Sequence, residues 1–223
     1  MEESFEKAGL SQRYNFYDGV SADDPPITQL TAGRTENKAF SIMFGHLGLI
    51  DAFYRDENVA FGIFCENDVL LCKDIVSLLP QVLEQYHKLN LDVLLLGYLL
   101  PFRLDQQDPS FPRVGEAVVH GSRSYTLHSF PQDLWGAQMY VLSKESAKTL
   151  LDKYGAGYVE KGLKDTTMQP FASDWTITKD GRRALVYPML ALENGRVQRI
   201  PDPAHATFHE NCFNAQFEEG MFC

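Results

Sequence analysis

The chain is short of cysteine, tryptophan and positive charge. It has four cysteines and two tryptophans among 223 residues, and 30 acidic residues against 20 lysines and arginines. The cysteine spacings fit neither a zinc site nor a disulfide framework, which favours a reducing compartment, and we expect a cytoplasmic protein. The formal net charge of −10 argues against nucleic acid and anionic membranes as partners. An acidic protein that handles an anionic nucleotide needs a cation to bridge the two.

The sequence also lacks a long apolar run. The longest candidate, Leu91–Phe102, contains Asp92 and Pro101 and is shorter than the roughly 20 residues of a membrane-spanning helix. The N-terminal sequence MEESFEKAGL is acidic and amphipathic, unlike a signal peptide. We therefore expect no transmembrane segment. The hydrophobic content of 44% is ordinary for a globular protein, and the length suits one large domain over residues 1–223.

Strand-like and helix-like segments alternate along the chain, which predicts an α/β domain with a largely parallel central sheet. The proline-containing segments Ser21–Thr35 and Pro101–Ser124 are predicted to be irregular. Residues 196–223 are expected to form a tail that packs on a core of about residues 10–195. Apolar spacing predicts helices over Glu2–Ala8, Lys38–Arg55, Lys73–Leu89 and Lys144–Tyr154, the last with Ser143 as its N-cap. It predicts strands over Tyr14–Tyr17, Val59–Cys65, Leu91–Leu96, Tyr125–Leu127, Trp135–Leu142 and Arg183–Val186.

The segment Val59–Leu71, VAFGIFCENDVLL, carries the strongest functional signal. An apolar run typical of a strand ends at Glu66-Asn67-Asp68, and a second apolar run follows. Two carboxylates separated by one residue offer the hard oxygen ligands that Mg²⁺ or Mn²⁺ prefers. In α/β sheets, ligands bind beyond the carboxyl ends of strands, which is where Glu66 and Asp68 fall. The alternative interpretation is a solvated turn between two elements.

Four segments of the chain carry a family likeness: YNFYDGVSA (Tyr14–Ala22), FGHLGLIDAFYRDENVAFGIFCENDVLL (Phe44–Leu71), WGAQMYVLSKESAKTLL (Trp135–Leu151) and SDWTITKDGRRALVYPMLALENG (Ser173–Gly195). In this order they resemble glycosyltransferase family 25, which includes lipooligosaccharide and collagen galactosyltransferases. The likeness covers most of residues 10–195. The chain departs from the family at Asn67, where members generally have a third carboxylate, and at its start, because members usually begin with a strand that is missing here.

The resemblance implies a GT-A-like fold, the nucleotide-diphospho-sugar transferase type, and a metal-dependent transfer of a hexose. The donor would be a UDP-sugar, the acceptor a glycan or another hydroxyl compound, and the transfer would invert the anomeric centre. The metal would be Mn²⁺ or Mg²⁺, with Asp68 and Glu66 as ligands. Glu66 is alternatively a contact to the donor sugar or ribose. His209, with His205 nearby in sequence, is a candidate for completing the metal shell; the alternative is a surface position on the tail.

A general base is needed to take the proton from the acceptor hydroxyl. Asp174 is the candidate, and Asp133 is the reserve because it precedes the segment that begins at Trp135. The alternative for Asp174 is the N-cap of a short helix at Trp175. An aromatic plane such as Trp135 can stack on a sugar ring, although it can equally be a core residue.

Three further residues enter through the resemblance. His46 would lie near the donor, where it orients a loop or a phosphate, although a histidine on the apolar face of a helix is commonly a core residue. Gly136 and Gln138 match the substrate-binding segment that follows Trp135.

Two other functions stay open. A degenerate transferase domain that only binds carbohydrate is compatible with Asn67, and the same acidic pair also fits a metal-dependent hydrolase of sugar nucleotides.

Overall fold

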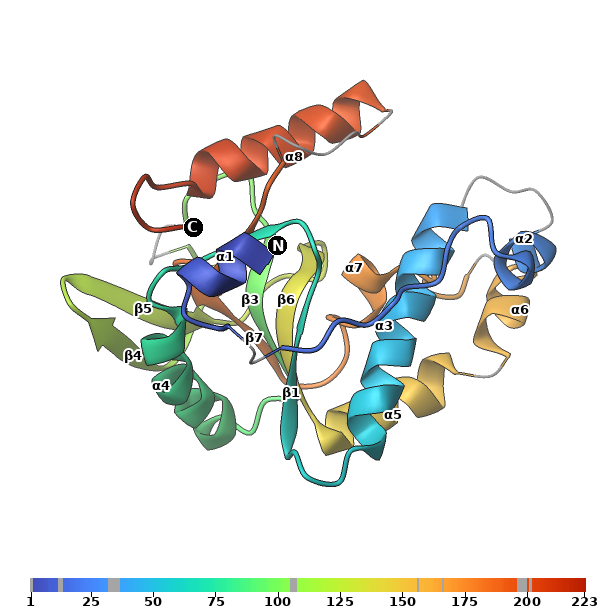
Figure 1. The fold of residues 1–223 in the computed structure, drawn as a ribbon, viewed down its shortest axis with the longest axis horizontal. Coiled ribbons are helices and arrows are strands. Elements are labelled where there is room, and N and C mark those ends of the chain that lie inside the picture. Colours follow the sequence, from blue (N-terminus) through green and yellow to red (C-terminus); the bar gives the residue numbers. More distant parts are fainter. Residues whose placement is uncertain are drawn as a thin grey trace.

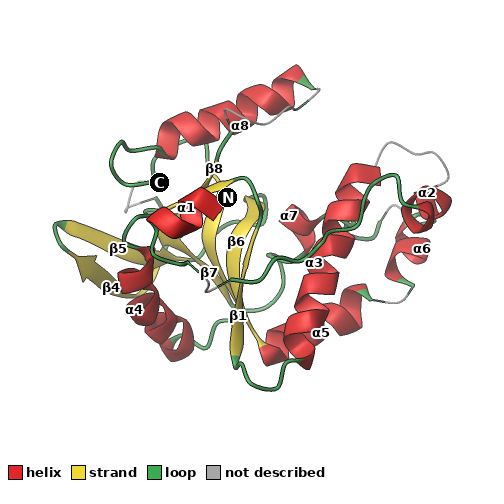
Figure 2. Ribbon diagram, viewed as in Figure 1, coloured by secondary structure: helices red, strands yellow, loops and turns green. Residues whose placement is uncertain are grey.

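A six-stranded mixed sheet forms the centre of the molecule, with helices on both sides (Figures 1 and 2). The computed structural model describes residues 2–11, 14–31, 37–104, 108–155, 157–165, 167–195, 200 and 202–223. A separate two-stranded ribbon joins β2 (Val69–Leu71) to β8 (Ala191–Glu193). The sheet order is β1 (Phe61–Cys65), β6 (Trp135–Ser143), β3 (Val93–Leu99), β7 (Arg183–Tyr187), β5 (Arg123–His128) and β4 (Arg113–His120).

The prediction of an α/β domain is confirmed, but the prediction of a largely parallel sheet is wrong. Only β3 and β7 pair in parallel, whereas the other four pairings in the sheet are antiparallel. The alternation of strands and helices does place β1, β3 and β7 in one direction. Strand β6, however, inserts antiparallel between β1 and β3. An apolar pattern predicts that a strand exists but does not predict which strands pair with it, so the position of β6 could not be predicted from the sequence.

The described helices fall into groups around the sheet. Helices α3 and α5 lie on one side of the central strands and α4 on the other, while α8 stands at one end (Figure 2). No described helix is both long and apolar enough to cross a membrane. The helices are α1 (Glu2–Lys7), α2 (Pro25–Thr31), α3 (Asn37–Arg55), α4 (Ile75–Lys88), α5 (Lys144–Tyr154), α6 (Tyr158–Gly162), α7 (Ser173–Thr176) and α8 (Pro203–Gln216).

The long periodic helices are confirmed, and the misses fall in polar or weakly patterned segments. Helix α2 lies within the segment predicted to be irregular, as does β4. The strand predicted over Tyr14–Tyr17 is wrong, because these residues belong to none of the described strands. Helix α8 was missed because its apolar residues do not gather on one face. Asp202, whose side chain accepts a hydrogen bond from the Ala204 N–H, with Pro203 at the first helical position, was the available signal.

The core lies where β3 and β6 cross the centre of the sheet. All of β3 is buried, as are β6 residues from Gly136 to Leu142, which fits strands covered on both faces. Gly97 of β3 has a packing role, since a Cβ there would lie 2.7 Å from the Ala191 carbonyl oxygen. Because glycine has no Cβ, β8 can lie close against β3 at this position.

Removal of the α5 cap is expected to destabilise the protein. The Ser143 hydroxyl accepts a hydrogen bond from the Ser146 N–H at 3.1 Å, as the sequence predicts. Because Ser143→Ala leaves this N–H without its partner, we expect the free energy of unfolding to fall by about 1 kcal/mol in urea denaturation. The exposed Ser122→Ala is the matched control. Equal stability of the two variants would contradict the assignment.

Candidate functional site

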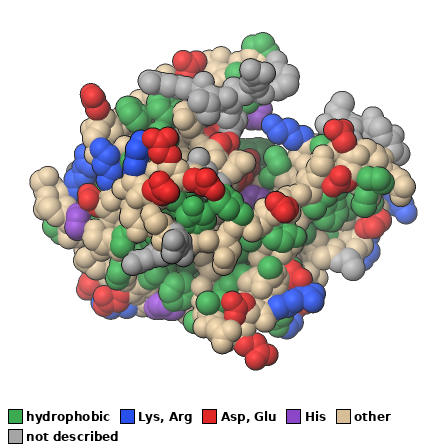
Figure 3. Space-filling model, viewed as in Figure 1, with side chains coloured by type: hydrophobic (Ala, Val, Ile, Leu, Met, Phe, Trp, Pro, Cys, Tyr) green, Lys and Arg blue, Asp and Glu red, His purple; other side chains and the backbone are tan. Residues whose placement is uncertain are grey.

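An open groove of about 2640 Å³ runs along one edge of the sheet. Its walls come from α3, the turn between β1 and β2, the start of β6, α7, the end of β8 and α8. Figure 3 shows the molecule hollowed between the region of α8 and that of α3. Most of its lining residues are apolar or aromatic, and among them lie carboxylates and histidines from α3, the turn between β1 and β2, α7, the end of β8 and α8.

The turn Glu66-Asn67-Asp68 lies at the C-terminal end of β1, where the sequence places it. The Glu66 N–H donates to the Gln138 carbonyl at 2.9 Å, and the Asp68 carbonyl accepts from the Asn194 N–H at 2.8 Å. One side of the turn is therefore fixed to β6 and the other to the residue after β8. These backbone bonds hold both carboxylates at the groove, since Glu66 and Asp68 both line it.

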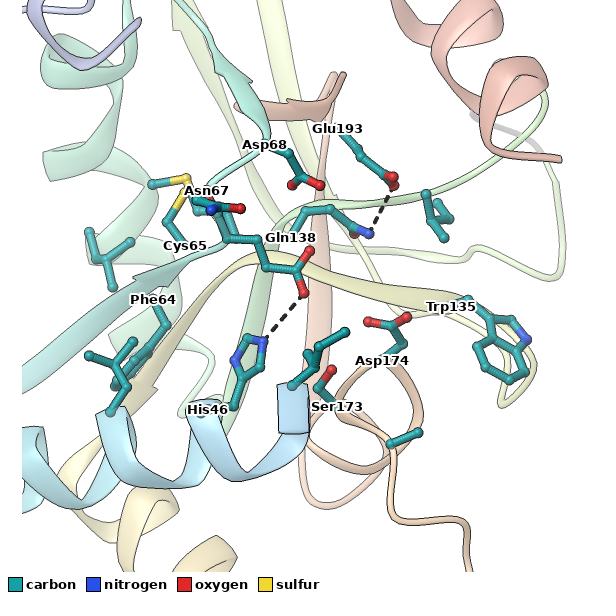
Figure 4. A pocket seen from close by; sticks show the side chains of 18 of the residues that line it. His46, Phe64, Cys65, Asn67, Asp68, Trp135, Gln138, Ser173, Asp174 and Glu193 are labelled. Carbon is teal, nitrogen blue, oxygen red and sulfur yellow. Dashed lines mark hydrogen bonds and ion pairs between the residues drawn. The ribbon is translucent and has the colours of Figure 1, made fainter. Parts of the chain in front are cut away.

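Glu193 lies in the same group and was not predicted as a site residue. The register of the ribbon pairs Val69 with Glu193, so the residue after Asp68 faces the last residue of β8. Glu193 is 4% exposed and accepts a hydrogen bond from Gln138 Nε2 at 3.3 Å (Figure 4). An acid that directly follows a short apolar run was its sequence signal. Strand β8 is too short for periodicity to reveal it.

Gln138 is held in place by its neighbours on β6. It is 2% exposed, and a Cβ on Gly136, whose φ is +124°, would lie 2.4 Å from Gln138 Oε1. Glycine at position 136 therefore leaves the space that the amide occupies. Gln138 Oε1 itself is buried without a hydrogen-bond partner among the described residues. A buried acceptor with no donor beside a groove is a feature that a ligand donor would satisfy.

His46 forms a hydrogen-bonded chain with Tyr140 and Glu66. Its Nδ1 lies 2.8 Å from the Tyr140 hydroxyl, and its Nε2 lies 3.3 Å from Glu66 Oε1 (Figure 4). Burial raises the pKa of Tyr140 well above its ordinary value, so the phenol keeps its proton. Both contacts are satisfied when the His46 proton is on Nε2: the Tyr140 hydroxyl then donates to Nδ1, and Nε2–H donates to Glu66. His46 is thus buried, as a core histidine would be, and also contacts the acidic turn.

Helix α8 brings two histidines to the groove. His209 Nδ1 lies 2.7 Å from Glu193 Oε1, and His209 Nε2 lies 2.8 Å from His205 Nε2. Burial lowers the pKa of His209, but the hydrogen bond to Glu193 and its charge outweigh this, so the net pKa is raised. The alternative of a surface position is wrong for His209, which is 8% exposed.

Asp174 lies in α7 and points into the groove (Figure 4). The alternative that it caps this helix is wrong, because the N-cap is Ala172 and Asp174 is inside. Burial, followed by the charge of Glu66, raises the pKa of Asp174 to about 7; Glu193 acts in the same direction, and the histidines oppose it. Among the described residues, no group donates a hydrogen bond to its carboxylate. These are the properties of a carboxylate that exchanges a proton near neutral pH.

Trp135 and Asp133 both line the groove but differ in setting. Trp135 begins β6, is 43% exposed and contacts Trp175, the neighbour of Asp174, with ring centroids 5.1 Å apart. Its exposure argues against the core interpretation. Asp133 is exposed in the preceding loop. It lacks the buried environment that Asp174 has, so the structure favours Asp174 over the reserve base.

The predicted metal ligands gather at one groove but do not converge on one point. Among the described residues, no three His, Cys, Asp or Glu side chains are close enough together to hold an ion. Glu66 contacts His46, and His209 is engaged by Glu193 and His205. The set is nevertheless rich in carboxylate oxygen and carries excess negative charge. That chemistry fits Mg²⁺ or Mn²⁺, and the ligation by Asp68, Glu66 and His209 stays a prediction.

The chain matches no protein-family model, and no curated protein matches it significantly.

The raised pKa of Asp174 predicts a pH-dependent effect on stability. The folded pKa of about 7 lies above the value of an unfolded aspartate, so the native state binds more protons and loses stability as pH rises from about 4 to 7. Asp174→Asn removes this loss. We expect its melting temperature to rise relative to wild type between pH 5 and pH 8, as measured by calorimetry. The exposed Asp133→Asn is the control, and a parallel response of the two variants would contradict the burial of Asp174.

Proposed function

We propose that this protein is a metal-dependent glycosyltransferase that moves a hexose from a nucleotide-diphosphate sugar to an acceptor hydroxyl with inversion. The observation that carries the proposal is the carboxylate of Asp174. It lies in a groove with several other carboxylates, has a pKa of about 7 and directly precedes Trp175, which contacts the exposed Trp135. The resemblance of Phe44–Leu71 and Trp135–Leu151 to glycosyltransferase family 25 supports the same reaction and favours uridine as the base of the donor.

Asp174 supplies the proton acceptor that an inverting transfer requires. The acceptor oxygen attacks the anomeric carbon, the bond from that carbon to the diphosphate oxygen breaks, and its electron pair leaves with the nucleotide. The hydroxyl proton passes to Asp174. A pKa of about 7 leaves a useful fraction of carboxylate at neutral pH and makes it a stronger base than a solvated aspartate.

The other side chains bind and orient. Asp68 and Glu66 would hold Mn²⁺ or Mg²⁺, with His209 joining if its Nε2 releases His205. When bound, such an ion stabilises the charge that develops on the departing diphosphate. His46 fixes the orientation of Glu66 through its Nε2–H, and Tyr140 fixes His46 in turn. The negative charge of the groove supports this assignment, since an anionic donor needs a cation to enter it.

Loss of the base is expected to stop turnover without unfolding the protein. Asp174→Asn keeps the size of the side chain but cannot accept the proton, so we expect kcat to fall about 10²- to 10⁴-fold. Release of UDP from UDP-hexoses in the presence of Mn²⁺, with and without acceptor sugars, measures it. Asp133→Asn should stay within a few-fold of wild type. Wild-type turnover in Asp174→Asn would reject Asp174 as the base, and UDP release that needs no acceptor would favour a hydrolase.

Donor binding is expected to depend on Asp68. Mn²⁺ with UDP should raise the melting temperature of the wild-type protein, because a ligand at about 100 times its Kd adds about 2.7 kcal/mol of stability. Asp68→Asn should abolish this shift, while the exposed Asp152→Asn on α5 should retain it. If wild type shows no shift with any nucleotide, the transferase proposal fails and a carbohydrate-binding domain remains.

A further inference from the structure

The two tryptophans of the chain lie together beside the groove, and Trp135 is part of its lining. The sequence contains two, and Trp135 from β6 meets Trp175 from α7 with ring centroids 5.1 Å apart and ring planes at 53°. Trp135 is 43% exposed, whereas Trp175 is partly buried. In the view of Figure 4, Asp174 lies between Trp135 and the carboxylates of the acidic turn. An exposed indole next to a reactive carboxylate is a surface on which a pyranose ring can stack.

Lys179 contacts both parts of this tryptophan pair. Its Nζ lies 4.4 Å from the centroid of the Trp175 ring and donates a hydrogen bond to the carbonyl of Leu134, the residue before Trp135. The two contacts connect Lys179 to both indoles, one through the ring face and one through the backbone. Arg183 fixes Lys179 in turn, because its Nη1 donates to the Lys179 carbonyl at 2.9 Å.

An ammonium group is rarely buried, because its charge loses the stabilisation that water provides. Lys179 is 5% exposed, and burial, followed by the charge of Arg183, lowers its pKa to about 8. Asp133 and Asp174 oppose this shift. An apolar side chain of similar length would fill the position without this desolvation. What the ammonium adds is a directed contact to the Trp175 face and to the backbone beside Trp135.

We propose that Trp135 and Trp175 form the stacking platform for the acceptor sugar, and that Lys179 is the positioning residue that holds it. This inference rests on the proposed function and names its acceptor as a pyranoside. The apolar face of the ring lies on Trp135, which places its hydroxyls toward Asp174. The platform then lies on the acceptor side of Asp174, and the acidic turn lies on the donor side.

Tryptophan emission tests the platform directly, because no third tryptophan contributes a background. The probes are the methyl β-glycosides of galactose, glucose and N-acetylglucosamine, titrated with excitation selective for indole. We expect at least one to change the emission. Lys179→Met should weaken that binding about 3- to 10-fold, the range of a lost cation–π contact and its hydrogen bond. Lys148→Met, on the exposed face of α5, is the matched control.

A pH titration of emission keeps the test independent of ligand and of folding differences. The ammonium faces Trp175, Arg183, Asp133 and Asp174, and its deprotonation should change indole emission with a midpoint near pH 8. Lys179→Met should lack this transition, Lys179→Arg should lack it while retaining sugar binding, and Asp174→Asn should retain it. In turnover, Lys179→Met should raise KM for the acceptor and leave KM for the donor unchanged.

The outcomes separate this inference from the proposed function. If Mn²⁺ and UDP stabilise the protein but none of the glycosides changes the emission, the platform is wrong and the transferase stands. If the glycosides bind and the nucleotide does not, the tryptophan platform is supported and the protein is a carbohydrate-binding domain rather than a transferase. Sugar binding that Lys179→Met leaves unchanged overturns the role of Lys179.

Discussion

The antiparallel pairing of β6 with β1 and β3 sets the positions of most candidate side chains. Gly136, Gln138 and Tyr140 all lie on β6, in the stretch where its pairing with β3 is irregular. Tyr140 orients His46, Gln138 contacts Glu193, and Gly136 leaves the space for the Gln138 amide. The Gln138 carbonyl also fixes the acidic turn through the Glu66 N–H. If β6 shifted by one residue along its neighbouring strands, its side chains would change sides and these contacts would be lost.

The groove contains several carboxylates that do not contribute to the stability of the fold. Glu66, Asp68, Asp174 and Glu193 all line it, and carboxylates in a poorly solvated space repel one another. His46 and His209 each satisfy one of them. Asp174 has no such partner among the described residues, and burial together with the charge of Glu66 raises its pKa to about 7. Side chains that destabilise the native state and share one open cavity are typical of sites retained for binding or chemistry.

The sequence predicted what is local and missed what depends on long-range pairing. The α3 helix follows from apolar spacing, the α5 cap from Ser143, and the place of Glu66 and Asp68 from the end of a buried strand. Glu193 was missed because it enters the site through the register of a three-residue strand. The His46–Tyr140 contact joins residues 94 positions apart, and no local pattern encodes such a pair. His209 was predicted from resemblance, whereas the helix that carries it was not.

The reaction that we propose has two substrates, and different parts of the groove suit each of them. The acidic turn and Glu193 contribute carboxylates to the groove, whereas Lys179 lies over the Trp175 ring and accepts a hydrogen bond from Arg183 at its carbonyl. A neutral sugar ring can stack on an indole face, and the Lys179 ammonium lies over the ring of Trp175. In the reaction that we propose, Asp174 lies between these two parts of the groove and takes the proton of the attacking hydroxyl.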